Sequence, residues 1–172
     1  MTQRDPEWGE TYPRADVARL LGLRPDDVAD DVPVQAVSTG VSFVVTPLRS
    51  LAAVRAVHPD FAAIRERLAK TRDRAFYLVT RETQDANARL HARYPFERGE
   101  DPATGSAAGC ACAWMVRHGV AAAEEQVVIE QGLEIQRPSQ LFVRSARDGE
   151  RVRAVRVGGF AVPVMNGEYR LR

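Results

Sequence analysis

The stretch EDPATGSAAGCACAWMVRHG, residues 100–119, decides the fold because it predicts a helix without a polar face. Between Thr104 and His118, alanine, cysteine, tryptophan, methionine and valine occupy every side of this helix. A helix that is apolar all round has to be covered all round. Its first turns carry only glycine, serine and alanine, which lets neighbouring backbone approach closely. We therefore expect a strongly curved sheet wrapped around the helix.

The start of this helix has the features of an anion site. Pro102 holds Asp101 in an extended conformation, and Thr104 or Ser106 is placed to cap the first turn. The N–H groups of residues 105–107 point out of the N-terminus, where the helix dipole adds about half a positive charge. Such an end binds carboxylate or phosphate without lysine, and the two hydroxyl groups add donors. In a dry pocket, Asp101 would donate or share a proton with the anion.

A simpler interpretation is that these residues only cap a core helix and that Asp101 stabilises its dipole. Other motifs fit less well. Gly105 and Gly109 do not complete a dinucleotide fingerprint, and no phosphate-loop lysine follows. Ser106 lacks the flanking glycines of a hydrolase nucleophile elbow. The residue pattern alone leaves the anion site and the structural cap both open.

The rest of the chain predicts short helices and many strands. Helical spacing of apolar residues indicates helices at 16–23, 51–57 and 61–68. Runs of β-branched and aromatic residues indicate strands. The predicted strands are two within residues 32–48, separated by a bend near Gly40, then 75–80, 88–96, 126–132, 140–146, 152–164 and 167–172. Residues 1–33 form a lead-in with the first helix. Without repeats or a flexible linker, we expect one α+β domain over residues 1–172.

The composition excludes several partners. The 24 basic and 23 acidic residues leave a net charge of +1, which supplies no field for nucleic acid or for an anionic membrane. No apolar run has the length of a membrane span, and the polar opening MTQRDPEWGE does not resemble a signal peptide. We therefore expect a cytoplasmic protein.

Cysteines and histidines do not predict a metal site or a cofactor. Cys110 and Cys112 lie two apart in the predicted helix, so their side chains point apart, and we expect small buried thiols. None of the three histidines has a second ligand at helical or strand spacing. His91, in a predicted strand near the acidic motif, is the one histidine of interest.

Several short motifs in a fixed order carry a resemblance to a known family. They are EDPATGSAAG at 100–109, EQG at 130–132, RPS at 137–139, VRVGG at 155–159 and GEYRL at 167–171. In this order they resemble the C-terminal half of the phenazine-biosynthesis (PhzF-like) isomerases, which have the diaminopimelate-epimerase fold. The stretch VSTGVSFVVTPLRSLAAV resembles the opening of that half. The resemblance implies two similar domains, each a curved, mostly antiparallel sheet around a central helix, with the active site between them.

The resemblance also implies roles for the residues at the helix start. The aspartate of DPATGS, here Asp101, would hold or protonate the substrate. The residues after it, Thr104, Gly105 and Ser106, would bind the substrate through amides and hydroxyl groups. Related epimerases use two cysteines as acid and base, one of them at this position. Because Asp101 stands there and both cysteines lie deeper in the helix, thiol-based racemisation is disfavoured.

One family feature has no counterpart in this chain. The glutamate thought to remove the substrate proton belongs to a preceding domain, and Glu100 is a poor substitute because neighbouring residues in an extended segment point to opposite sides. We therefore expect the C-terminal half of a cofactor-independent isomerase that acts on a small carboxylate, completed by an N-terminal half from another chain. The alternative is a non-catalytic domain for small-anion binding or assembly, which homodimerises through the vacated interdomain face.

Overall fold

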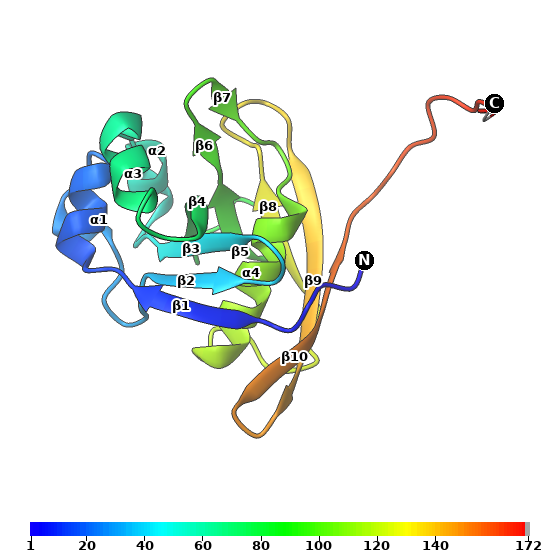
Figure 1. Ribbon diagram of the computed structural model, residues 1–172, viewed down its shortest axis with the longest axis horizontal. Coiled ribbons are helices and arrows are strands. Elements are labelled where there is room, and N and C mark those ends of the chain that lie inside the picture. Colours follow the sequence, from blue (N-terminus) through cyan, green and yellow to red (C-terminus); the bar gives the residue numbers. More distant parts are fainter. Residues whose placement is uncertain (171–172) are drawn as a thin grey trace.

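One eight-stranded sheet curls around helix α4, Gly105–Arg117, in the computed structural model, which describes residues 1–170 (Figure 1). The strand order is β1-β2-β3-β4-β5-β8-β9-β10. The β3–β4 and β5–β8 pairs are parallel, and the other neighbours in the sheet are antiparallel. This is the expected α+β architecture, a mostly antiparallel sheet around a central helix.

The remaining elements have short connections between them. In chain order the structure contains β1 (Glu7–Thr11), α1 (Arg14–Leu20), a 3-10 turn (Pro25–Asp27), β2 (Gln35–Ser38), β3 (Ser42–Pro47), α2 (Leu51–Arg55), α3 (Phe61–Leu68), β4 (Asp73–Thr80), β5 (Ala88–Arg93), β6 (Pro95–Phe96), β7 (Gly99–Glu100), α4, β8 (Val127–Gln131), β9 (Ser139–Asp148) and β10 (Arg151–Gly158).

The sheet brings its two ends together through the first residues of the chain. The amino group of Met1 donates to the Val157 carbonyl at 2.8 Å, and the Gln3 amide donates to the Val155 carbonyl at 2.9 Å. Just beyond, the Arg4 amide donates to the Thr39 carbonyl at 3.3 Å. Residues 1–4 therefore link β10 to the end of β2, which closes the wall around α4.

Helix α4 is buried as its sequence predicts. Ten consecutive residues, Ala107–Val116, are buried. Space is tight where the wall is close: a Cβ at Gly109 would lie 3.1 Å from Thr39 Oγ1 and 3.2 Å from the Gln3 side chain. Near the other end, Trp114 Nε1 donates to the Pro33 carbonyl at 3.0 Å, so the one polar atom of this indole is satisfied.

Helices α1, α2 and α3 cover the outer face of part of the sheet, on the side away from α4 (Figure 1). Strand β4 shows the two layers most clearly. Tyr77 and Val79 pack in the core around α4, whereas Phe76 and Leu78 pack in the second core beneath the three short helices. A strand buried on both faces reads as a continuous apolar run, as residues 75–79 do.

Residues 1–33 contain β1 in addition to the predicted helix. Three predicted strands are shorter than expected or absent. The strand predicted over 88–96 ends at Arg93, and Pro95–Phe96 pairs with Gly99–Glu100 in a separate hairpin. The strand predicted over 152–164 ends at Gly158, and residues 159–170 form no strand. Of the strand predicted over 167–172, the last two residues lie outside the described part of the chain.

The helices give no candidate for a membrane span. Among residues 1–170, none of them combines the length and the apolar character that a bilayer crossing requires.

Both cysteines are free and buried in α4. Burial raises the pKa of Cys112 to about 11 and also raises the pKa of Cys110. We therefore expect both thiols to react with an aromatic disulfide reagent at mildly alkaline pH only as fast as the protein opens, because the thiolate is the reactive species. Thiol titration should give two fast thiols per chain in denaturant. A fast thiol in the native protein would contradict the enclosed helix.

Candidate functional site

The turn Asp101–Thr104 joins β7 to α4 and is closed by its own side chains. The Asp101 amide donates to the Tyr94 carbonyl at 3.1 Å, which anchors the turn to the chain just before β6. Thr104 Oγ1 donates to Asp101 Oδ2 at 2.9 Å, and the Ala103 amide donates to Oδ1 at 3.4 Å. Asp101 is half-buried and Thr104 is buried. The carboxylate thus lies over the turn that starts the helix.

The prediction that Thr104 or Ser106 caps the first turn is wrong. Thr104 is the N-cap residue, but its side chain accepts no bond from the helix amides. Its hydroxyl instead accepts from the Gln131 side chain and donates to Asp101. No hydrogen bond within residues 1–170 uses the Ser106 hydroxyl.

The amides at the helix start remain free. The Ala108 amide donates to the Thr104 carbonyl at 2.9 Å and begins the helical ladder. None of the hydrogen bonds formed among residues 1–170 uses the amides of Gly105, Ser106 or Ala107. Gly105 and Ser106 are partly exposed. Free amides at a helix N-terminus favour a negative charge, so this position suits a carboxylate or phosphate.

Gln131, at the end of β8, holds the turn in place. Its side chain is fully buried and makes four hydrogen bonds. Oε1 accepts from Tyr77 Oη at 2.9 Å and from the Thr104 amide at 3.2 Å. Nε2 donates to the Asp101 carbonyl at 2.7 Å and to Thr104 Oγ1 at 2.9 Å. The residue belongs to the EQG motif, which was the only sequence signal for this contact.

Gly132 also lies against the turn. Its φ of +83° is in the left-handed region, and a Cβ there would lie 2.3 Å from the Arg137 carbonyl oxygen and 2.9 Å from that of Pro102. Only glycine fits such a close backbone approach without strain. The EQG and DPATGS motifs are therefore two sides of one packed contact.

A buried cluster of charged residues lies beside this contact. His91 Nδ1 is 2.8 Å from Glu130 Oε1, and its Nε2 is 2.9 Å from Glu134 Oε1. Arg93 Nη2 donates to Glu100 Oε2 at 2.6 Å, and Arg93 Nε is 3.9 Å from Glu134 Oε2. Glu130 also accepts the amides of residues 84 and 85. Glu100 is thus held in an ion pair with Arg93.

The opposite charges of His91 and its glutamate partners stabilise one another. Burial lowers the pKa of His91, but hydrogen bonds with Glu134 and Glu130 outweigh burial and leave the pKa raised. Burial raises the pKa of Glu134, but the hydrogen bond with His91 outweighs it and leaves that pKa lowered. With a carboxylate at each ring nitrogen, His91 is held as an imidazolium that donates twice. His91 is therefore a structural ion-pair partner behind the turn.

This charge state predicts how stability depends on pH. Because folding raises the pKa of His91, its contribution is complete below the unfolded value of about 6.5 and is lost as the pH rises through the folded value. The free energy of unfolding of the wild type, measured in urea from about pH 6 to about pH 9, should fall relative to that of His91→Gln. Parallel curves for the two proteins would show that His91 is not charged in the fold.

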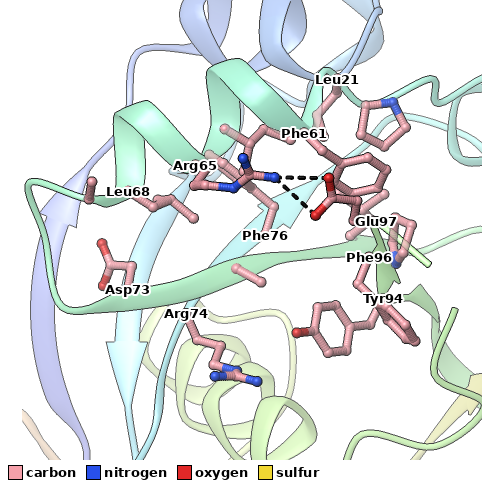
Figure 2. Close-up of a pocket in the computed structure, with 16 residues that line it drawn as sticks. Leu21, Phe61, Arg65, Leu68, Asp73, Arg74, Phe76, Tyr94, Phe96 and Glu97 are labelled. Atoms are coloured by element: carbon pink, nitrogen blue, oxygen red, sulfur yellow. Dashed lines mark hydrogen bonds and ion pairs between the residues drawn. The ribbon is translucent and has the colours of Figure 1, made fainter. Parts of the chain in front are cut away.

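A separate cavity of about 340 Å³ lies between α3, β4 and the β6–β7 hairpin (Figure 2). Its walls include the rings of Phe61, Phe76, Tyr94 and Phe96. Figure 2 shows an ion pair at this cavity, in which one Arg65 nitrogen lies 2.9 Å from both oxygens of Glu97. None of the predicted site residues lines it. The start of α4 is therefore not part of this cavity.

The described residues offer no ready metal centre. Within residues 1–170, no group of three or more histidine, cysteine, aspartate or glutamate side chains is arranged to hold a metal ion.

Comparison with known proteins identifies the family. The model of the family described as "Phenazine biosynthesis-like protein" matches residues 5–167. The chain belongs to this family. Two PhzF-like relatives illustrate it: the trans-2,3-dihydro-3-hydroxyanthranilate isomerase of Pseudomonas aeruginosa is 33% identical over 99% of this chain, and an uncharacterized isomerase of Mesorhizobium japonicum is 34% identical over 92%.

Solved structures of similar proteins share the fold. A phenazine biosynthesis protein of the PhzF family from Bacillus anthracis superimposes on 92% of this chain with a TM-score of 0.82 at 23% identity. A predicted epimerase from Pseudomonas aeruginosa matches 95% with a TM-score of 0.74 at 29% identity. In each case the chain spans only part of its relative: 58% of the P. aeruginosa isomerase and 56% of the B. anthracis structure.

Proposed function

We propose that this chain provides one half of an isomerase active site, in which the free amides of Gly105 and Ser106 bind a carboxylate of the substrate and Asp101 transfers a proton. The observation that supports this most directly is the pairing of unused amides with an adjacent carboxylate at the start of α4. Family membership supports the reaction class, because relatives along nearly the whole chain are isomerases.

The proposed chemistry needs two groups. An isomerisation that shifts a double bond removes a proton from one atom and returns a proton to another, so it needs a base and an acid within hydrogen-bond reach. The substrate carboxylate would bind the two amides and the Ser106 hydroxyl, which fixes the reacting atoms beside Asp101. Asp101 supplies one of the two proton-transfer groups. Glu100 does not supply the other, because Arg93 holds it within the charged cluster.

The second group would come from outside this chain. The P. aeruginosa isomerase has a further two-fifths of its length that this chain does not span. We propose that an N-terminal half from another chain supplies the base and covers the helix start. Residues 159–170 offer a surface for it, since Phe160, Val162, Val164, Met165 and Tyr169 are each between 81% and 92% exposed. Exposed apolar groups in such number mark an association surface.

The same exposed segment favours a second candidate, in which two copies of this chain associate through it and the anion site serves binding without catalysis. A C2 dimer would cover the segment in both copies. Light scattering separates the two: a stable homodimer without activity supports this candidate, whereas a stable heteromer with an N-terminal partner supports the isomerase.

The test is to co-express the chain with the N-terminal portion of a PhzF-like relative or with a neighbouring reading frame that encodes one. The purified complex should isomerise a small cyclic carboxylate, with trans-2,3-dihydro-3-hydroxyanthranilate as the first compound tried. The substitution Asp101→Asn should lower kcat by roughly 10²- to 10⁴-fold, because the asparagine side chain cannot transfer the proton. The rate is followed by proton NMR in deuterated buffer.

Asp26→Asn is the matched control, because Asp26 is exposed in the 3-10 turn and the same charge is removed. It should leave the rate unchanged. An active complex in which Asp101→Asn keeps full activity would remove Asp101 from the reaction. A chain that never co-purifies with any N-terminal half, and shows no activity, would count against the split enzyme.

A further inference from the structure

The four hydrogen bonds of Gln131 have directions that the backbone fixes. The Thr104 amide is only a donor, so it has to face the carbonyl oxygen of the Gln131 side chain. The Asp101 carbonyl is only an acceptor, so it has to face the nitrogen. These two backbone groups settle which end of the carboxamide is which. The Gln131 nitrogen must then direct its other hydrogen to Thr104 Oγ1.

The direction of the Gln131–Thr104 hydrogen bond also determines how the Asp101 carboxylate is bonded. A threonine hydroxyl has one hydrogen, and Thr104 Oγ1 already accepts from Gln131, so its own hydrogen goes to Asp101 Oδ2 at 2.9 Å. Oδ2 is therefore held by a donor that has no other partner available. Oδ1 keeps only the long bond of 3.4 Å from the Ala103 amide. The two oxygens of Asp101 are not equivalent.

We propose that Gln131 is a positioning residue of the isomerase site: through the Thr104 hydroxyl it fixes Oδ2 as an acceptor and leaves Oδ1 as the oxygen that gives and takes the substrate proton. This inference rests on the proposed function, since it specifies how Asp101 acts there. During turnover, the proton leaves a substrate carbon for Oδ1, or leaves Oδ1 for a carbon. Oδ2 keeps its hydrogen bond throughout.

The surroundings of Gln131 make this arrangement rigid. The residue is fully buried, as is Tyr77, whose hydroxyl donates to Oε1. All four donor and acceptor positions of the carboxamide are used, so no alternative orientation preserves the bonds. Next along the chain, Gly132 packs against the Pro102 carbonyl. Displacement of the turn would break several buried polar contacts at once, and each such loss is costly.

A spectroscopic test reports on this arrangement without any assay of activity. In ¹⁵N-labelled protein, both Nε2 hydrogens of Gln131 should exchange slowly with D2O, because each has a buried acceptor. In Thr104→Val, which keeps the side-chain shape but removes the oxygen, one of the two should lose its hydrogen-bonded chemical shift. Thr104→Ser should restore it. Fast exchange of both hydrogens in the wild type would overturn the proposal.

Kinetics of the completed isomerase give the second readout. Thr104→Val and Gln131→Met should each lower kcat by about 10- to 100-fold, because a misplaced acid loses its geometry, while KM stays within about twofold. Thr104→Ser should recover most of kcat. Gln126→Glu is the control, since Gln126 is exposed just before β8. Normal kcat in both Thr104→Val and Gln131→Met would overturn the proposal.

The two proposals fail in different ways. If the wild-type complex shows no isomerisation, the proposed function fails and the positioning role in turnover fails with it. The NMR experiment then tests only the hydrogen-bond arrangement, which protected Nε2 hydrogens support and exchanging ones overturn. If the wild type is active and both Thr104→Val and Gln131→Met keep full activity, the proposed isomerase function is supported and the positioning role of Gln131 is contradicted.

Discussion

The burial of α4 on every side is the constraint from which the rest of the structure follows. A helix with no polar face needs a wall all round it, and the protein builds that wall from one curled sheet whose two ends are joined by residues 1–4. The wall is close to the helix near its start, where the side chains of Thr39 and Gln3 leave little space beside Gly109. The same constraint places the two cysteines out of reach of solvent.

Enclosure of the helix also determines where its charge can act. The body of α4 is sealed, but its first amides, at Gly105 and Ser106, remain at the surface without partners among the described residues. The Asp101 turn beside them is held by Gln131 and Gly132, and the charged cluster around His91 packs behind it. A rigid, preorganised turn next to a free helix end is an arrangement that favours binding of an anion in one orientation.

Much of the fold was predictable from local patterns, and the exceptions have physical causes. The apolar sequence of α4 predicted both the helix and the wrapped sheet, and the β-branched runs predicted most strands. Strand β1 was missed because EWGET has no apolar alternation and is mostly exposed. The strand expected beyond Gly158 has an apolar run typical of a buried strand, but residues 159–170 find no partner strand within the described chain.

The candidate site was predicted only in part, because one of its contacts joins residues that are far apart in the sequence. Asp101, Gly105 and Ser106 lie within one short segment, so the helix-start chemistry could be predicted from the sequence. The contact between Gln131 and the turn, in contrast, joins residues about thirty apart. Nothing in the local pattern says that the EQG segment lies against DPAT, so the engagement of the Thr104 hydroxyl with Gln131 and Asp101 in place of a helix cap was also hidden.

The central claim, a sealed helix with an open first turn, is tested most directly by native-state hydrogen exchange of the α4 amides, followed by NMR. The amides from Cys110 to Val116 should exchange only through global unfolding, while those of Gly105 and Ser106 should exchange rapidly. Slow exchange at Gly105 and Ser106 without any added anion, or early exchange in the body of the helix, would contradict the account.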